Sequence, residues 1–158
     1  IELLQRTFKD NPAPAQPSPD TLGLITLRVS DVDASLAFYQ QGLGMRLLST
    51  MAVDDGRSDP FDLYFLGWDD EPLPDAEVAS VSNREWTYQR PSTLIELQHY
   101  RTSLADLTSG RLQHIALATD DLVRLERDLT DAGTVVNAQD ASFSFTSPDG
   151  HPFVASRI

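Results

Sequence analysis

The chain carries one order of secondary structure twice, and this internal repeat limits its fold more than any other feature. The first copy opens with a strand pattern at residues 23–31, GLITLRVSD. Strand patterns at 45–53, 61–68 and 93–100 close it. Between them lies a helical stripe at positions i, i+4, i+7 and i+11, formed by Val32, Leu36, Tyr39 and Leu43. Asp31 or Asp33 is suited to cap this helix, and Gly42 or Gly44 to end it.

The second copy repeats this order in fewer residues. A strand pattern at 112–121, LQHIALATDD, precedes a helical stripe that ends at Gly133. Short strand patterns follow at 134–138, 141–147 and 151–158, with the turn sequence SPDG before the last one. A shift of 90 residues aligns Leu24 with His114 and Val32 with Leu122. We therefore predict an α+β fold of two βαβββ modules whose mixed sheets form a concave cleft.

Two stretches interrupt the repeat. Residues 11–20 hold four of the ten prolines, so we interpret residues 1–20 as an extended arm ahead of a single domain. Module one then spans 21–100 and module two spans 111–158, with a link between them. A long polar segment, 69–92, connects two strands of the first module.

Composition excludes several classes of function. The net charge of −12 disfavours nucleic acids and anionic membranes as partners, because both require a basic surface. The absence of cysteine excludes disulfides, thiolate catalysis and iron–sulfur clusters. Neither a signal peptide nor an apolar run of the ~20 residues that a membrane helix needs is visible, so we expect a cytoplasmic protein.

Glu96 is the residue of greatest chemical interest. It interrupts the apolar strand pattern TLIELQH at 93–99, where a charge costs free energy unless it is solvated, paired or bound to a metal. Side chains alternate along a strand, so Leu94, Glu96 and Gln98 share one face, while His99 points to the other. Gln98 can thus supply a ligand oxygen beside Glu96, whereas His99 is expected to have a structural role.

Several motifs together resemble glyoxalase I of the vicinal-oxygen-chelate (glyoxalase/bleomycin-resistance) superfamily over about residues 22–157. These motifs are LRVSDVDASLAFYQQGLGMRLL, DLYFLGW, TLIELQH, HIALAT and SPDG. The resemblance implies lactoylglutathione lyase-type chemistry, in which Zn²⁺ or Ni²⁺ polarises a small substrate and a glutamate moves a proton. It also implies a homodimer.

The resemblance places four metal-ligand positions in this chain, and only two carry ligand side chains. Glu96 and His114 match the family's ligands, whereas Leu24 and Val154 stand where the other two are expected. Zinc sites use at least three protein ligands, so the sequence predicts a degenerate site that binds a divalent metal weakly or not at all. Ser156 shares a strand face with Val154 and is a weak substitute.

The same resemblance suggests a substrate subsite. Arg28 matches an arginine that contacts the glutathione carboxylate, although a salt bridge to an acidic residue explains it equally well. Gln98, Tyr100 and Arg111 are the other candidate substrate contacts, and Glu96 is the candidate catalytic carboxylate. Trp68, Trp86 and Tyr88 flank the polar segment and suit either a pocket wall or an interface, a choice that the sequence leaves open.

Three functions agree with these residues. The first is a lyase or isomerase of glyoxalase type with a weakened metal site. The second is a metal-free protein of the bleomycin-resistance type that binds or sequesters an apolar small molecule, since Leu24 and Val154 make the expected cleft less polar. The third is a structural or regulatory dimer, which the sequence favours less.

Overall fold

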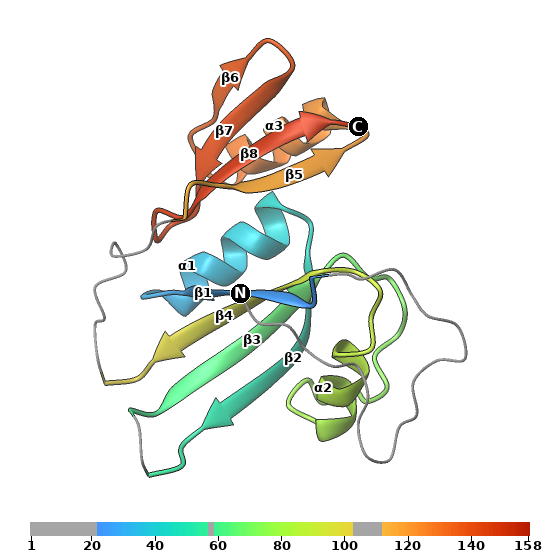
Figure 1. Cartoon of the computed structure of the whole chain (residues 1–158), viewed down its shortest axis with the longest axis vertical. Coiled ribbons are helices and arrows are strands. Elements are labelled where there is room, and N and C mark those ends of the chain that lie inside the picture. The colour runs from blue at the N-terminus through green and yellow to red at the C-terminus, as the bar shows by residue number, and fades with distance from the viewer. Residues whose placement is uncertain (1–21, 57–58, 103–111) are drawn as a thin grey trace. The chain divides into compact units, whose positions relative to one another are not determined.

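The computed structural model describes residues 22–56, 59–102 and 112–158 (Figure 1). The chain divides into two compact units, one of Ile1–Leu27 and Arg46–Arg101, the other of Arg28–Met45 and Thr102–Ile158. The helix of the first repeat copy therefore belongs to the same unit as the sheet of the second copy. The predicted arm at 1–20 and most of the link between the modules lie outside the described residues.

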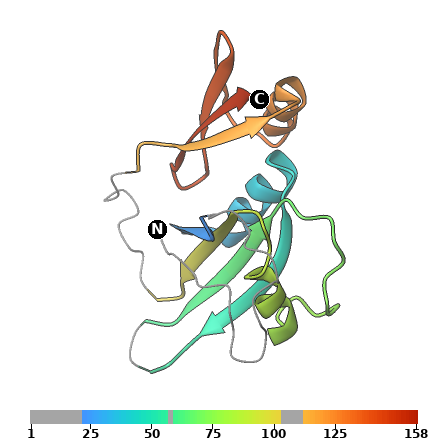
Figure 2. The same cartoon turned by 45° about the vertical axis from the view of Figure 1, so that its right-hand side comes forward.

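The first unit contains a four-stranded sheet with the order β1-β4-β3-β2. Strand β3 pairs antiparallel with both β2 and β4. The predicted strands are confirmed, and their bounds are β1 Leu24–Arg28, β2 Arg46–Val53, β3 Phe61–Gly67 and β4 Leu94–Tyr100. The segment 69–92 also contains a helix that the sequence analysis missed, α2 Val81–Thr87, which lies beside β2 (Figure 2). Ser80 caps α2 by accepting a hydrogen bond from the Ser82 backbone N–H.

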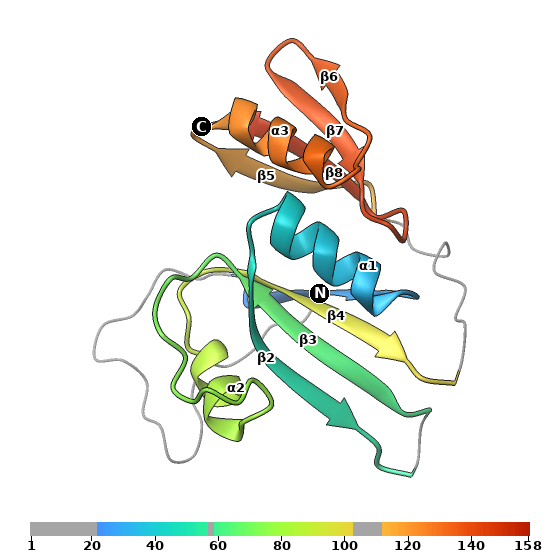
Figure 3. The same ribbon diagram turned by 180° about the vertical axis from the view of Figure 1, so that it is seen from behind.

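The second unit also contains a four-stranded sheet, with the order β5-β8-β7-β6. The repeat of strand order confirms the predicted α+β fold of two βαβββ modules. Helix α3 covers one face of this sheet (Figure 3). A cleft shared by the two sheets stays a prediction, because the structure defines each unit by itself. The elements of the second sheet and its helix are β5 Ile115–Thr119, α3 Leu122–Asp131, β6 Asn137–Gln139, β7 Ser142–Thr146 and β8 Pro152–Arg157.

The predicted first helix forms as two consecutive segments, α1 Val32–Ala37 and the π-helical turn η1 Phe38–Gly42. Of the two predicted caps, Asp31 is the one used, since its carboxylate accepts a hydrogen bond from the Ala34 N–H at 3.0 Å. Gly42 ends η1, and a Cβ at this glycine would lie 3.1 Å from the Leu129 side chain on α3. The lack of a side chain at Gly42 thus permits the close approach of the two helical segments.

An aromatic core joins these segments to the second sheet. Phe38 lies with its ring centroid 6.1 Å from Phe145 and 6.0 Å from Phe153. The rings of Phe145 and Phe153 stack at 5.3 Å, and Tyr39 packs against Phe153 from the edge. The π-helical turn therefore anchors α1 to the β7 and β8 side of its unit.

Candidate functional site

Glu96 is buried and paired in the structure. Its side chain lies on β4 with 6% of its surface exposed, and its Oε1 accepts a hydrogen bond of 2.8 Å from the Thr26 hydroxyl on β1. Thr26 itself is exposed, so the pair reaches the surface of the first unit at its β1 end. Of the three explanations considered for this charge, a polar partner within the protein is the one that the geometry supplies.

Most neighbours of Glu96 on this sheet face are apolar. Phe65 on β3 stands directly opposite Glu96 in the sheet register, and Leu24 and Leu94 lie in the same cluster as Phe65. Strand parity is consistent with this arrangement, because Thr26 and Leu24 lie two residues apart on β1. The full cluster consists of Leu24, Leu48, Leu63, Phe65 and Leu94.

The segment 69–92 packs onto this cluster. Leu73, Trp86 and Tyr88 are partly buried against it, and the Tyr88 ring meets Phe65 edge-on with centroids 5.6 Å apart. Trp86 and Tyr88 thus pack over the sheet face that carries Glu96, and a role in a ligand pocket or an interface stays a prediction. Trp68 is 49% exposed.

Buried polar contacts fix the segment 69–92. The side chain of Asn83 is fully buried, accepts a hydrogen bond from the Asp75 N–H at 2.9 Å, and donates to the carbonyls of Asp75 and Glu77. The guanidinium of Arg90 lies 4.5 Å from the centre of the Trp86 ring, 3.0 Å from Asp69 and 2.7 Å from Glu71. These contacts connect both ends of the segment and orient Trp86 over the apolar cluster.

The other predicted residues of the first unit occupy varied positions. Gln98 is half-buried on β4, opposite Leu63, two positions along the strand from Glu96. Tyr100 ends β4, and its ring packs 5.3 Å from Phe61. His99 stands opposite Asp62 in the register, which agrees with its expected structural role. Gln98 is therefore the predicted substrate residue placed nearest to Glu96 along its strand.

The remaining predicted positions belong to the second unit or lie outside the described residues. His114 is exposed just before β5, and Val154 is half-buried on β8, paired with Ala116 on β5 and Ser144 on β7. Arg28, at the end of β1, is exposed. Arg111 lies outside the described residues. The second-unit members of the expected ligand set are thus an exposed imidazole and an apolar side chain.

The SPDG turn forms a hydrogen-bond network that the sequence analysis missed. The carboxylate of Asp149 accepts hydrogen bonds from the Ser30 N–H at 2.8 Å, the Ser30 hydroxyl at 2.6 Å and the Ser35 hydroxyl at 3.1 Å. His151, which follows the turn, is half-buried, with its Nδ1 3.0 Å from the Ser147 hydroxyl. Burial lowers the pKa of His151, and the nearby Asp149 carboxylate partly opposes this effect.

Burial also acts on Tyr39 in the same unit. It raises the pKa of the Tyr39 phenol well above its usual value, with Ser147 acting in the opposite direction. The hydroxyl lies near Ser147 but makes no hydrogen bond of normal geometry with the described residues. Tyr39 therefore stays protonated at neutral pH and belongs to the core.

The donor groups of each unit do not fit a metal centre. Within either unit, no three of the described His, Asp and Glu side chains are close enough to hold one ion. Leu24, at a position where the resemblance expects a ligand, is 1% exposed inside the apolar cluster. Since Zn²⁺ sites need at least three protein ligands, the first unit offers Glu96 as a single donor from the expected set.

Comparison with known proteins identifies the family. The model of the Glyoxalase/Bleomycin resistance protein/Dioxygenase superfamily matches residues 21–154. The chain belongs to this superfamily. None of the described helices is long and apolar enough to cross a membrane.

Several relatives carry the name lactoylglutathione lyase. The chain is 44% identical over 82 residues to the one from Pseudomonas aeruginosa, covering 51% of this chain and 42% of that protein. It is 35% identical over 112 residues to the one from Neisseria meningitidis serogroup A, covering 70% of this chain and 65% of that protein. The chain spans between 32% and 65% of the lengths of the curated relatives it matches.

Solved structures show the same fold. The trypanothione-dependent glyoxalase I of Leishmania major superposes with a TM-score of 0.64 at 24% identity, covering 86% of this chain and 85% of that one. TnmS3, an antibiotic-binding protein from Streptomyces, gives a TM-score of 0.52 at 18% identity, covering 90% and 98%. At these identities the likeness establishes the fold alone.

Proposed function

We propose that this chain binds a small molecule at the sheet face of the first unit that carries Glu96, without a metal held by Glu96 and His114. The supporting observation is the Glu96–Thr26 pair, a carboxylate fixed by a hydroxyl at 2.8 Å beside apolar side chains. A carboxylate in such surroundings is a strong hydrogen-bond acceptor and a possible proton acceptor for a bound molecule. Glu96 is the proposed catalytic or orienting group, and Gln98 is its proposed neighbour in ligand binding.

The apolar wall suggests what kind of molecule this face accepts. Leu24 and Phe65 are buried beneath this face. The half-buried side chains of Trp86 and Tyr88 offer aromatic surface on the sheet face that carries Glu96. A largely apolar molecule with one hydrogen-bond donor matches this combination, because ligand sites typically pair apolar walls with a few placed polar groups. The antibiotic-binding function of TnmS3, a structural neighbour, is compatible with this interpretation.

Metal analysis tests the proposal. We expect the purified chain to hold no stoichiometric Zn²⁺ or Ni²⁺, and titration with either ion to give the same affinity before and after Glu96→Gln. Stoichiometric metal that is lost in both Glu96→Gln and His114→Ala would contradict the metal-free proposal. As a positive control, Leu24→Gln combined with Val154→Glu restores the family's ligand pattern and should raise the affinity for both ions.

A second candidate function follows from the relatives named lactoylglutathione lyase. In this case a divalent metal, weakly held, would activate the hemithioacetal of methylglyoxal and glutathione, with Arg28, Tyr100 and Arg111 as substrate contacts. An assay of lactoylglutathione formation with added Zn²⁺ or Ni²⁺ separates the two candidates. Metal-stimulated turnover that disappears in Glu96→Gln would favour the lyase.

The proposed homodimer is tested in the same preparation by light scattering.

A further inference from the structure

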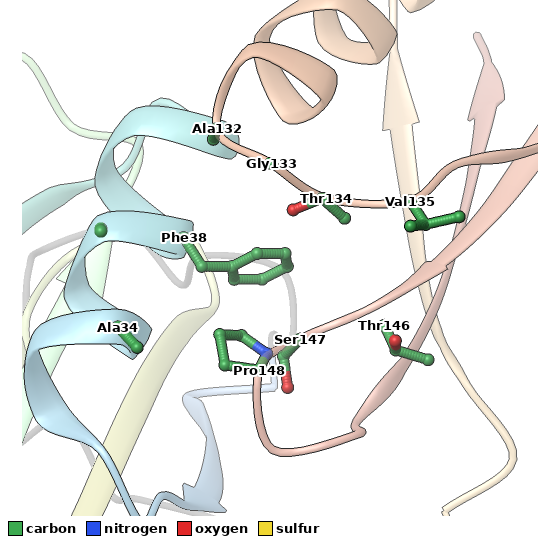
Figure 4. A pocket seen from close by; sticks show the side chains of 10 residues that line it. Ala34, Phe38, Ala132, Gly133, Thr134, Val135, Thr146, Ser147 and Pro148 are labelled. Atoms are coloured by element: carbon green, nitrogen blue, oxygen red, sulfur yellow. The ribbon is translucent and has the colours of Figure 1, made fainter.

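The second unit contains a pocket of about 390 Å³ on the helical side of its sheet (Figure 4). Ala34 and Ala37 of α1 form one wall, with the Phe38 ring beside them. The loop after α3, with Thr134 and Val135, forms a second wall, and the start of the SPDG turn closes the third side. All lining residues belong to one compact unit, and none of them is a residue that the proposed function uses.

The walls of the pocket are fixed by contacts outside it. The three hydrogen bonds that Asp149 accepts from Ser30 and Ser35 hold the SPDG turn against the first turn of α1. The missing side chain of Gly42 lets η1 approach the end of α3. Phe38 is held by the rings of Phe145 and Phe153. Because each wall is tied to the same core, the pocket is largely preformed, as small-molecule sites usually are.

The lining determines the chemistry of an occupant. Among the residues that the structure describes, no charged side chain lines the pocket, although the whole chain carries a net charge of −12. Val135 is 77% exposed at the rim, so an apolar side chain is held in water beside the alanines of α1. Hydroxyl groups of Thr134, Thr146 and Ser147 supply the polar part of the lining, and that of Ser147 already faces His151 Nδ1. An anion gains nothing from such a site, whereas an uncharged apolar molecule buries Val135 and the alanine surface.

We propose that this pocket is a binding site for a small, uncharged, mostly apolar molecule with one hydroxyl or carbonyl group. The volume falls within the range of about 300–1,000 Å³ that is typical of small-molecule sites. The apolar body would lie against Phe38 and the alanines of α1, and its polar group would face Thr134 or Thr146. The proposed pocket site does not use Glu96, so failure of the proposed function would leave this proposal unaffected.

Titration of the full chain with benzyl alcohol, followed by methyl NMR, tests this site. Benzyl alcohol is an uncharged ring with one hydroxyl, and benzoate provides an anion of nearly the same shape. We expect saturable shifts of the Ala34, Ala37 and Val135 methyl signals with benzyl alcohol, and an affinity for benzoate at least about tenfold weaker. Shift changes that do not saturate and that spread over both units would overturn the proposal.

Two variants with controls complete the test. Val135→Asp introduces a charge at the rim and should weaken benzyl alcohol binding by about tenfold or more. Val123→Asp is the matched control, since Val123 is 78% exposed on α3 and does not line the pocket. Ala37→Leu should fill the pocket and abolish the shift of the Ala34 methyl, with Ala141→Leu on an exposed turn as its control. Equal loss in Val135→Asp and Val123→Asp, or full binding by Ala37→Leu, would refute the site.

Discussion

The two sheets share one strand order, yet the corresponding faces of these sheets differ sharply. Phe65, Leu63 and Leu94 in the first unit take the register positions that Ser144, Ser142 and Pro152 take in the second. The first set is buried in an apolar cluster under the segment 69–92, whereas the second set is half-buried. One module thus covers the face that carries Glu96 with its own chain. The second module has small side chains on the corresponding face, and its aromatic core lies on the helical side of its sheet.

This difference shows how a repeat can diverge without a change of topology. The β3–β4 connection of the first copy is long enough to form α2 and a wall, while the SPDG turn replaces it in the second copy. The short turn cannot cover a sheet face, but its Asp149 reaches Ser30 and Ser35 and holds α1. Stability of the first sheet should therefore depend on its covered face, and stability of the second on its helical side.

The largest expected effect comes from truncating the centre of the covered face. Phe65→Ala should destabilise the chain by about 3–5 kcal/mol, because Phe65 is fully buried and its removal leaves a cavity. Ser144→Ala, at the corresponding position of the second sheet, should change the free energy of unfolding by less than about 0.5 kcal/mol. Urea unfolding followed by far-UV circular dichroism measures both. Similar losses in the two variants would contradict the difference between the faces.

A smaller effect is expected from loosening the wall. Asn83→Ala removes three hydrogen bonds within the segment 69–92 and should cost about 2 kcal/mol, since buried backbone groups lose their partners. Glu85→Ala, at an exposed position of the same helix, is the control. Both tryptophans, Trp68 and Trp86, belong to the first unit, so their fluorescence reports on it specifically. An unchanged fluorescence transition in Asn83→Ala would show that the segment does not stabilise the sheet.

The parts of this fold that the sequence predicted are those with a regular period. Alternation and helical spacing located every described strand and the helical segments that follow β1 and β5, and parity placed Leu94, Glu96 and Gln98 on one face of their strand. Helix α2 was missed because seven residues between polar and proline-containing stretches show little periodicity. Ser80 as an N-cap before VSNREWT was the one available signal.

Polar contacts over long sequence separations were the harder part. The Thr26–Glu96 hydrogen bond depends on which strands are neighbours in the sheet, since 70 residues separate the partners. Asp149 was interpreted as a turn residue, which is correct, yet its bonds to Ser30 and Ser35 cross 119 and 114 residues. A single sequence specifies local conformation more directly than such distant pairs.

The smallest expected effect concerns acid sensitivity of the second unit. Because burial lowers the pKa of folded His151 below its unfolded value near 6.5, the unfolded chain takes up a proton first as the pH falls. The stability contributed by neutral His151 is therefore complete above about pH 6.5 and is lost as the pH falls through the folded pKa. In the protonated ring Nδ1 can only donate a hydrogen bond toward the Ser147 hydroxyl. Hydrogen exchange of β8 amides between about pH 7.5 and 5.5 should show a decline in protection that His151→Gln reduces.

His114→Gln is the control for this prediction, since His114 is exposed in the same unit. An identical decline in wild type and His151→Gln would mean that another group governs the acid response of this turn.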